Sequence, residues 1–143
     1  DGQFQKKDIL KIKSIVENDI KFDLIKCDRF WANGIVGNIP TVRYVGNIFA
    51  SILIKFSTGF KKINDPLNGL IMISKELANN IEVPKLFYRY GYPFYVITLA
   101  ASLSLKKDVI IGQVKNTITY GFSESRLRPS VMLFKLLYFS IKS

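Results

Sequence analysis

The chain has 143 residues, 48% of them hydrophobic and 22% charged, and this composition fits one globular domain with its own core. It contains no histidine and one cysteine, which excludes imidazole catalysis, histidine metal sites and an internal disulfide framework. The formal net charge of +10 favours an anionic partner, such as nucleic acid, a phosphorylated substrate or an anionic membrane, although a solvated basic surface would have the same charge.

Hydrophobic periodicity predicts an alternation of helices and strands. In chain order, we expect a helix at 6–19, a strand at 21–30, a loop at 31–40, a long apolar helix at 41–59, a turn at 61–69, a short buried strand at 70–74, a short helix at 75–81, an apolar helix at 93–105, a strand or hairpin at 108–121 and a final helix at 128–143. This alternation favours a mixed α/β sheet.

Local patterns predict which side chains of these elements are buried. The first helix places Ile9, Ile12, Ile15 and Val16 on one face at helical spacing. The segment at 21–30 has apolar residues, among them Phe22, Leu24 and Cys27, with polar residues between them, which is typical of a strand.

The final helix is apolar around nearly its whole circumference. Its only charges are Lys135 and Lys142, and Arg126 and Arg128 lie just before it. Such a helix is either buried in a core or lies in a membrane interface with basic flanks, and both alternatives stay open here. No apolar run reaches the roughly 18 residues needed to span a bilayer. We expect a cytoplasmic protein associated with the inner face of the cell membrane.

Several short motifs follow one another along the chain: "DGQ" (1–3), "DRF" (28–30), "RYVGN" (43–47), "TGFKKINDPLNGLIMIS" (58–74), "LFYRYGYP" (86–93) and "YGFSESRL" (120–127). Each is weak alone, and "NDPLNG" by itself indicates only a turn. In this order they resemble the later part of family-2 glycosyltransferases, which have the GT-A fold. The resemblance is nearest to polyprenyl-phosphate sugar synthases such as dolichyl-phosphate mannose synthase.

The resemblance implies a domain organisation and a metal site. Residues 1–127 would be a partial GT-A domain without its N-terminal nucleotide-binding half, and 128–143 a helix at the membrane interface. We therefore expect this chain alone to be weakly active or inactive. Asp1 resembles the second Asp of a metal-binding D-x-D motif, and Gln3 a nearby ligand, so Mg²⁺ or Mn²⁺ is the expected cofactor. Carboxylate and amide oxygens suit such hard cations.

The resemblance also implies roles for residues further along the chain. Asp65 would be a catalytic residue that orients the sugar or the acceptor, and otherwise it is a turn-capping Asp. The residues expected to bind substrate phosphates are Arg29, Arg43, Arg89, Ser125 and Arg126. A guanidinium binds phosphate oxygens bidentately, which suits this role. Alternatively, Arg29 pairs with Asp23 or Asp28, and Arg43 is solvated.

One departure from the family bears on the acceptor. Many members have an acidic pair just after the "RY" stretch, but no carboxylate lies between Arg89 and Asp108. Transfer to a hydroxyl needs a general base, whereas a phosphate acceptor is already anionic. The resemblance implies transfer of a sugar from a nucleotide-sugar, and this departure is consistent with polyprenyl phosphate, a lipid phosphate, as the acceptor. The alternatives are an inactive glycosyltransferase-like membrane-associated protein and a basic nucleic-acid-binding module.

Overall fold

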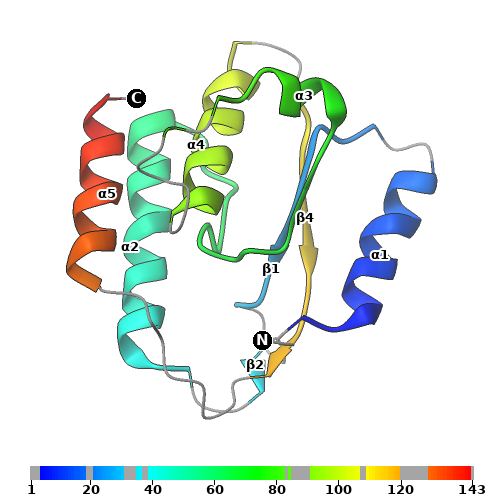
Figure 1. The fold of residues 1–143 in the computed structure, drawn as a ribbon, viewed down its shortest axis with the longest axis horizontal. Helices are drawn as coiled ribbons and strands as arrows, with labels where there is room; N and C mark the ends of the chain where they lie inside the picture. Colours follow the sequence, from blue (N-terminus) through cyan, green and yellow to red (C-terminus); the bar gives the residue numbers. More distant parts are fainter. Residues whose placement is uncertain are drawn as a thin grey trace.

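The computed structural model describes residues 4–18, 21–30, 35–36, 39–82, 84, 91–106, 109–119 and 129–142. This part of the chain forms a mixed α/β fold, which confirms the expected mixed α/β class, while the GT-A fold stays a prediction. Figure 1 shows a small sheet with α1 on one side and with α4, α2 and α5 following one another outward on the other.

The elements agree with the sequence periodicity to within a few residues. They are α1 (Lys6–Glu17), β1 (Leu24–Asp28), β2 (Ile35–Val36), α2 (Thr41–Thr58), β3 (Ile71–Ile73), α3 (Lys75–Asn79), α4 (Tyr92–Ser104), β4 (Ile111–Lys115), β5 (Ile118–Thr119) and α5 (Pro129–Lys142). Strand β2 lies within the segment that the sequence assigns to a loop. Helix α2 ends at Gly59, which has a left-handed φ of 72° and donates its N–H to the Lys55 carbonyl, as expected of a glycine C-cap.

The main sheet has the strand order β3-β1-β4, with β1 antiparallel to β3 and parallel to β4. The expectation of a strand at 21–30 is confirmed by β1. Residues 24–27 are all buried, because β1 is the central strand and helices cover both faces of the sheet (Figure 1). Strand β3 is half-buried rather than buried, since it lies at the edge of the sheet.

Residues 108–121 do not form a hairpin in their described part. Strand β4 belongs to the main sheet, and β5 pairs in parallel with β2 in a separate two-stranded sheet. The segment therefore runs in one direction through two sheets, which agrees with the strand alternative.

The buried face of α1 differs from the expected one. Ile12 is buried and Ile15 half-buried, but Ile9 and Val16 are 54% and 49% exposed. Asp8 instead lies on the buried side, four residues and thus one turn before Ile12. The narrow buried stripe of α1 packs against Cys27 and its neighbours on the second face of the sheet.

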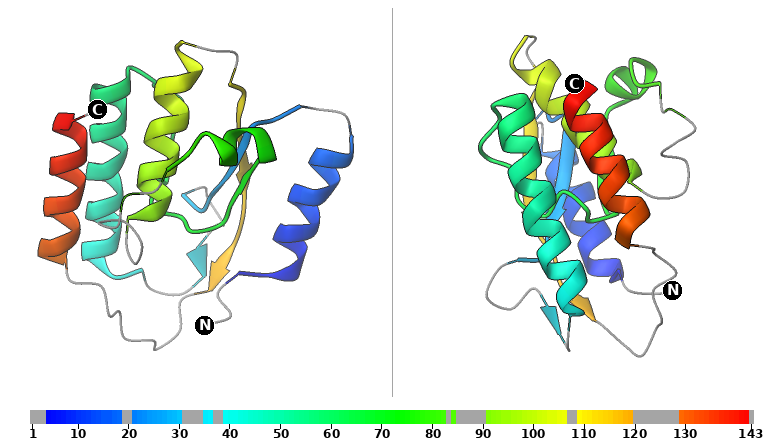
Figure 2. Two further views of the ribbon diagram at one scale, coloured as in Figure 1. Left: turned by 45° about the horizontal axis from the view of Figure 1, so that its top comes forward. Right: turned by 90° about the vertical axis from the view of Figure 1, so that its left-hand side faces the viewer.

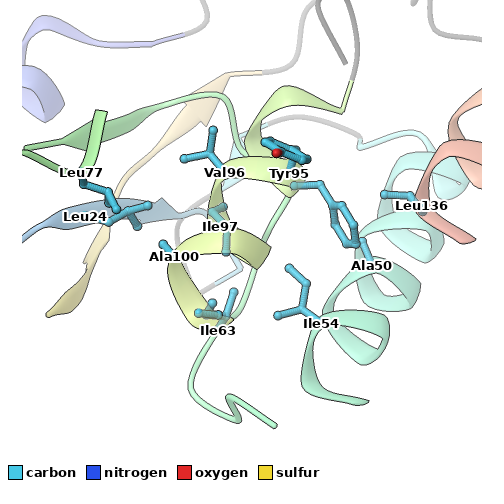
Figure 3. Packing of buried hydrophobic residues seen from close by; sticks show 12 residues of the cluster. Leu24, Ala50, Ile54, Ile63, Leu77, Tyr95, Val96, Ile97, Ala100 and Leu136 are labelled. Atoms are coloured by element: carbon cyan, nitrogen blue, oxygen red, sulfur yellow. The ribbon is translucent and has the colours of Figure 1, made fainter. Parts of the chain in front are cut away.

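The larger core lies between the sheet and α2, with α4 in the middle. Helix α4 contains no charged residue and buries most of its circumference. Figure 3 shows Ile97 of α4 between Leu24 of β1 and Ile54 of α2, with Leu136 of α5 on the outer side of α2. Helix α5 thus packs on α2 and stands farthest from the sheet (Figure 2).

Alanine is expected to change stability in opposite directions at two glycines, Gly46 within α2 and Gly59 at its C-terminal cap. Gly46 lies in the helix, and an added Cβ would meet nothing within 4 Å. We expect Gly46→Ala to raise the free energy of unfolding by about 1 kcal/mol, because alanine has the higher helix propensity. We expect Gly59→Ala to lower it by about 1 kcal/mol, because alanine disfavours the left-handed cap. Urea denaturation followed by circular dichroism measures both, and equal effects would contradict this account.

Candidate functional site at the carboxyl edge of the sheet

A cluster of polar side chains lies where the parallel strands β1 and β4 end. In open α/β sheets, ligands bind beyond the carboxyl ends of such strands. Asn116 directly follows β4 and donates its N–H to the Asp28 carbonyl at 3.0 Å. In Figure 1 the helices α1, α2, α4 and α5 all begin toward this end of the molecule. Their N-termini have partial positive charge, which favours anions at this edge.

The centre of the cluster is an ion pair between Arg29 and Asp65. The Arg29 Nη2 lies 3.0 Å from Asp65 Oδ1, and Arg29 Nε donates to the same oxygen at 3.1 Å. The backbone N–H of Arg29 donates to Asp65 Oδ2 at 3.0 Å. The Asp65 side chain is fully buried and that of Arg29 is 12% exposed. The two residues, 36 positions apart in sequence, therefore fix each other at the edge of the core.

The "NDPLNG" turn holds Asp65 in place. Asp65 has a φ of 50°, in the left-handed region that Asp and Asn adopt more readily than most residues. Asn68 donates its backbone N–H to the Asp65 carbonyl and its side-chain amide to Asp65 Oδ2, each at 3.1 Å. The same amide donates to Asn116 Oδ1 at 3.1 Å. The expected turn thus exists, and its side chains connect it to the end of β4.

Lys26 adds a second buried cation beside this pair. Its side chain is fully buried, although it extends from the central strand. The ammonium donates to the Cys27 carbonyl at 3.0 Å and also to the Asn64 carbonyl. Two basic side chains therefore flank the carboxylate of Asp65, and the hydrogen bonds of Lys26 join the end of β1 to the turn.

Burial changes the protonation of these groups. Desolvation lowers the pKa of Lys26 to about 8, although the nearby carboxylates of Asp65 and Asp28 act in the opposite direction. Desolvation also raises the pKa of Asp65, against the effect of Arg29 and Lys26. The cluster therefore holds its charges at a cost in solvation, which the mutual attraction of opposite charges offsets.

This pKa predicts a rise in stability with pH just above pH 8. In the unfolded chain a lysine keeps its proton to about pH 10.5, whereas folded Lys26 loses it from about pH 8. Because the unfolded state then binds more protons, the free energy of unfolding increases by up to about 1 kcal/mol between pH 8 and 9. Urea titrations at several pH values measure this slope.

Two variants serve as controls for the pH experiment. Lys26→Met should remove the slope between pH 8 and 9, and a slope that persists would contradict the assignment. Above pH 9 the slope should weaken because of Cys27. Burial raises the pKa of its thiol from 9.0 to about 11, so between these pH values the folded state keeps a thiol proton that the unfolded state loses. This opposes the effect of Lys26 on the free energy of unfolding. Cys27→Ala should restore the slope in that range.

Of the expected site residues that the structure describes, Arg29 and Asp65 are joined by a direct contact. Arg29 pairs with Asp65 rather than with Asp23 or Asp28, whose side chains accept N–H groups from Ile110 and Phe30. Arg43 lies in the first turn of α2 and is half-buried. Five other expected site residues lie outside the described residues: Asp1, Gln3, Arg89, Ser125 and Arg126.

Sequence analysis missed three members of the cluster: Lys26, Asn68 and Asn116. Lys26 had a usable signal, because it is the one charged residue within the apolar run "LIKC" of a central strand. The two asparagines had none, since both occur in ordinary turn-forming segments.

The described residues contain no group of three or more acidic, cysteine or histidine side chains that could hold a metal ion. The expected metal ligands lie outside them, so the metal stays a prediction. Within the described ranges, no helix combines the length and the apolar character needed to cross a membrane. In comparisons with known proteins, no family model, curated protein or solved structure matches this chain.

Proposed function

We propose that the chain is part of a glycosyltransferase domain that transfers a sugar from a nucleotide-sugar to an anionic acceptor, polyprenyl phosphate. The main support is the meeting of two separate motifs in one site. "DRF" and "NDPLNG" converge through the Arg29–Asp65 pair at the carboxyl edge of the parallel strands. This edge has the position at which α/β sheets bind ligands.

The proposed reaction forms a bond between an acceptor phosphate oxygen and the anomeric carbon of the sugar. The bond from that carbon to the diphosphate breaks, and the nucleoside diphosphate leaves with the electron pair. The acceptor phosphate needs no general base, in agreement with the absence of a carboxylate between Arg89 and Asp108. The expected Mg²⁺ or Mn²⁺, held by Asp1 and Gln3, would neutralise charge on the leaving group.

Within this proposal the described residues have distinct roles. Arg29 lies at the site edge and would bind a phosphate group of the donor or acceptor. Asp65 uses both carboxylate oxygens for contacts with Arg29 and Asn68, so we assign it a positioning role that fixes the guanidinium. Arg43, in the first turn of α2, would bind a second anionic group beside the positive end of the helix dipole.

Transfer of labelled sugar to polyprenyl phosphate tests the proposal. The assay presents UDP-, GDP- and dTDP-sugars with Mg²⁺ or Mn²⁺, to this chain and to a version extended by the residues encoded upstream. We expect transfer from at least one donor by the extended protein and little by this chain alone. The function would be refuted if the extended protein transferred sugar from none of the donors. The expectation that a nucleotide-binding half is needed would be refuted if this chain and the extended protein had equal turnover.

Arg29→Lys tests the role of the guanidinium in the same assay. It keeps a positive charge beside Asp65 but loses the planar fork, so we expect kcat to fall about 100-fold while the protein stays folded. Lys13→Gln, at an exposed position of α1, serves as the control with unchanged kcat. Wild-type turnover by Arg29→Lys would show that Arg29 has only a structural role.

A further inference from the structure

Lys26 is a buried cation that has no ion pair with any described residue. It extends from the central strand, and its side chain is fully buried. Both hydrogen bonds of its ammonium go to carbonyl oxygens, those of Cys27 and Asn64. The buried ion pair of the described residues joins Arg29 to Asp65 and does not include Lys26. Lysines are almost never fully buried without a charged partner, so this ammonium lacks a counter-ion.

The nearby carboxylates act on Lys26 only through space. Asp65 Oδ1 accepts from the side chain of Arg29, and Asp65 Oδ2 accepts from the backbone N–H of Arg29 and the amide of Asn68. Asp28 is half-buried, and its Oδ1 accepts the backbone N–H of the residue two positions on. The three charges that lie deepest, on Lys26, Arg29 and Asp65, therefore leave a surplus of one positive charge while Lys26 is protonated.

The helices that cover this side of the sheet supply no further carboxylate. Leu24 of β1 packs in the core with α2 and α4, whereas Ile25 and Cys27 pack on the side of α1. Because side chains alternate along a strand, Lys26 lies on the same side as Leu24. Neither α2 nor α4 contains Asp or Glu. Their titratable residues are Arg43, Tyr44 and Lys55 on α2 and Tyr92 and Tyr95 on α4.

The missing counter-ion makes the charge of Lys26 sensitive to pH and to its surroundings. Burial lowers the pKa of Lys26 to about 8, and Arg29 acts in the same direction, while Asp65, Asp28 and Cys27 act against it. An additional anion at this edge would attract the ammonium and make it hold its proton more tightly. By linkage, the proton must strengthen the binding of that anion by the same factor.

From this arrangement we infer that the carboxyl edge takes up an oxyanion and the proton of Lys26 together. The oxyanion, in the reaction a phosphoryl group, binds at Arg29 and is the counter-ion that the buried ammonium lacks. Lys26 is thus a positioning residue that acts through space, and loss of its proton weakens anion binding. The inference rests on the proposed function for the phosphate site at Arg29, and it deepens that function by making the site dependent on pH.

Sulfate is a suitable probe for this coupling. It is a tetrahedral dianion, like a phosphoryl group, but its charge stays constant between pH 7 and 9. Isothermal titration calorimetry at constant ionic strength measures its Kd for this chain. For a tenfold coupling, we expect Kd to rise about fivefold from pH 7 to pH 9. A Kd that does not change with pH would overturn the inference, and so would a lack of sulfate binding at pH 7.

Lys26→Met tests whether Lys26 causes the pH dependence. At pH 7 we expect this variant to bind sulfate about tenfold more weakly than the wild type, with a Kd that stays within about twofold up to pH 9. Lys75→Gln makes the same change in net charge at an exposed position of α3 and should keep the wild-type Kd at both pH values. A fivefold pH dependence that persists in Lys26→Met would show that another group is responsible. Circular dichroism of each variant confirms that it is folded.

Arg29→Lys locates the anion. The variant keeps a positive charge but loses the planar fork, so we expect sulfate to bind about tenfold more weakly at both pH values. The fivefold change with pH should remain, because Lys26 is still present. Wild-type sulfate affinity in Arg29→Lys would place the anion elsewhere and would contradict the inference.

The reciprocal effect of sulfate on Lys26 gives a measurement that does not depend on calorimetry. A tenfold coupling should move the rise in the free energy of unfolding from pH 8–9 to about pH 9–10 when the site is saturated with sulfate. Urea titrations in sulfate and in chloride at equal ionic strength measure this shift. The Cys27→Ala background removes the opposing effect of the thiol. If the rise stays at pH 8–9 in sulfate, the anion and the proton are not linked.

Failure of this inference is distinguishable from failure of the proposed function. Sugar transfer by the extended protein, together with sulfate binding that does not depend on pH, would refute the role of Lys26 alone. Proton-linked sulfate binding without sugar transfer from any donor would leave the role of Lys26 intact and refute the transferase.

Discussion

Replacing Asp65 with alanine is expected to lower the free energy of unfolding by about 3–5 kcal/mol. Asp65 is the buried anion between Arg29 and Lys26, and its removal leaves two cations in or near the core without that charge. The loss should be much larger than that of an exposed ion pair. Glu17→Ala, which breaks the exposed Lys13–Glu17 pair, should cost less than about 1 kcal/mol. Urea denaturation measures both variants.

A second substitution separates charge from packing in this prediction. In the Asp65→Ala background, Lys26→Met removes one of the two cations while keeping an unbranched side chain of similar length. We expect the double variant to be more stable than Asp65→Ala alone, so the two substitutions should be strongly non-additive. Additive losses, or a loss below about 1 kcal/mol for Asp65→Ala, would show that the cluster contributes little as an electrostatic unit.

Ile97→Ala should have the second largest effect, a loss of about 2–5 kcal/mol. Ile97 is fully buried on α4, between the central strand and α2 (Figure 3). Its truncation leaves a cavity in the core between the sheet and α2. Ile97→Val should lose only about 0.5–1.5 kcal/mol, because one methyl group is removed.

An exposed isoleucine serves as the control for the core variant. Ile48→Ala makes the same chemical change on α2, at a side chain that is 44% exposed. We expect an effect below about 1 kcal/mol, because no closed cavity forms. Similar losses for Ile48→Ala and Ile97→Ala would mean that the outer face of α2 is covered in solution. Light scattering would then show whether a second copy covers it.

The sequence predicts where the helices and strands lie better than it predicts which of their side chains are buried. Periodicity and caps locate the helices, as in α2 with Gly59 at its end, because these signals act within a few residues. The burial of Lys26 depends on β1 being the central strand, which follows from pairing with β3 and β4 far along the chain. Local alternation cannot supply that information. For the same reason α1 buries Asp8 together with Ile12, while Ile9 and Val16 of the expected face are exposed.

The candidate site shows the same limit. The turn at 64–69 and the arginine after β1 are evident in the sequence as separate motifs, and their family resemblance suggests a shared site. The ion pair between Arg29 and Asp65 is set by the register that brings the turn to the carboxyl edge. Sequence spacing offered Asp23 and Asp28 as nearer partners for Arg29. The actual partner could be found only from the tertiary arrangement.

The left-handed backbone of Asp65 restricts how this position can change in related chains. Glutamate preserves the charge but not the backbone, because its longer side chain lacks the tolerance of Asp, Asn and Gly for positive φ. Asparagine and glycine preserve the backbone but not the charge that compensates Arg29 and Lys26. No single replacement meets both requirements. A lineage that lost this carboxylate would therefore need to substitute a buried cation as well, and positions 26, 29 and 65 should covary.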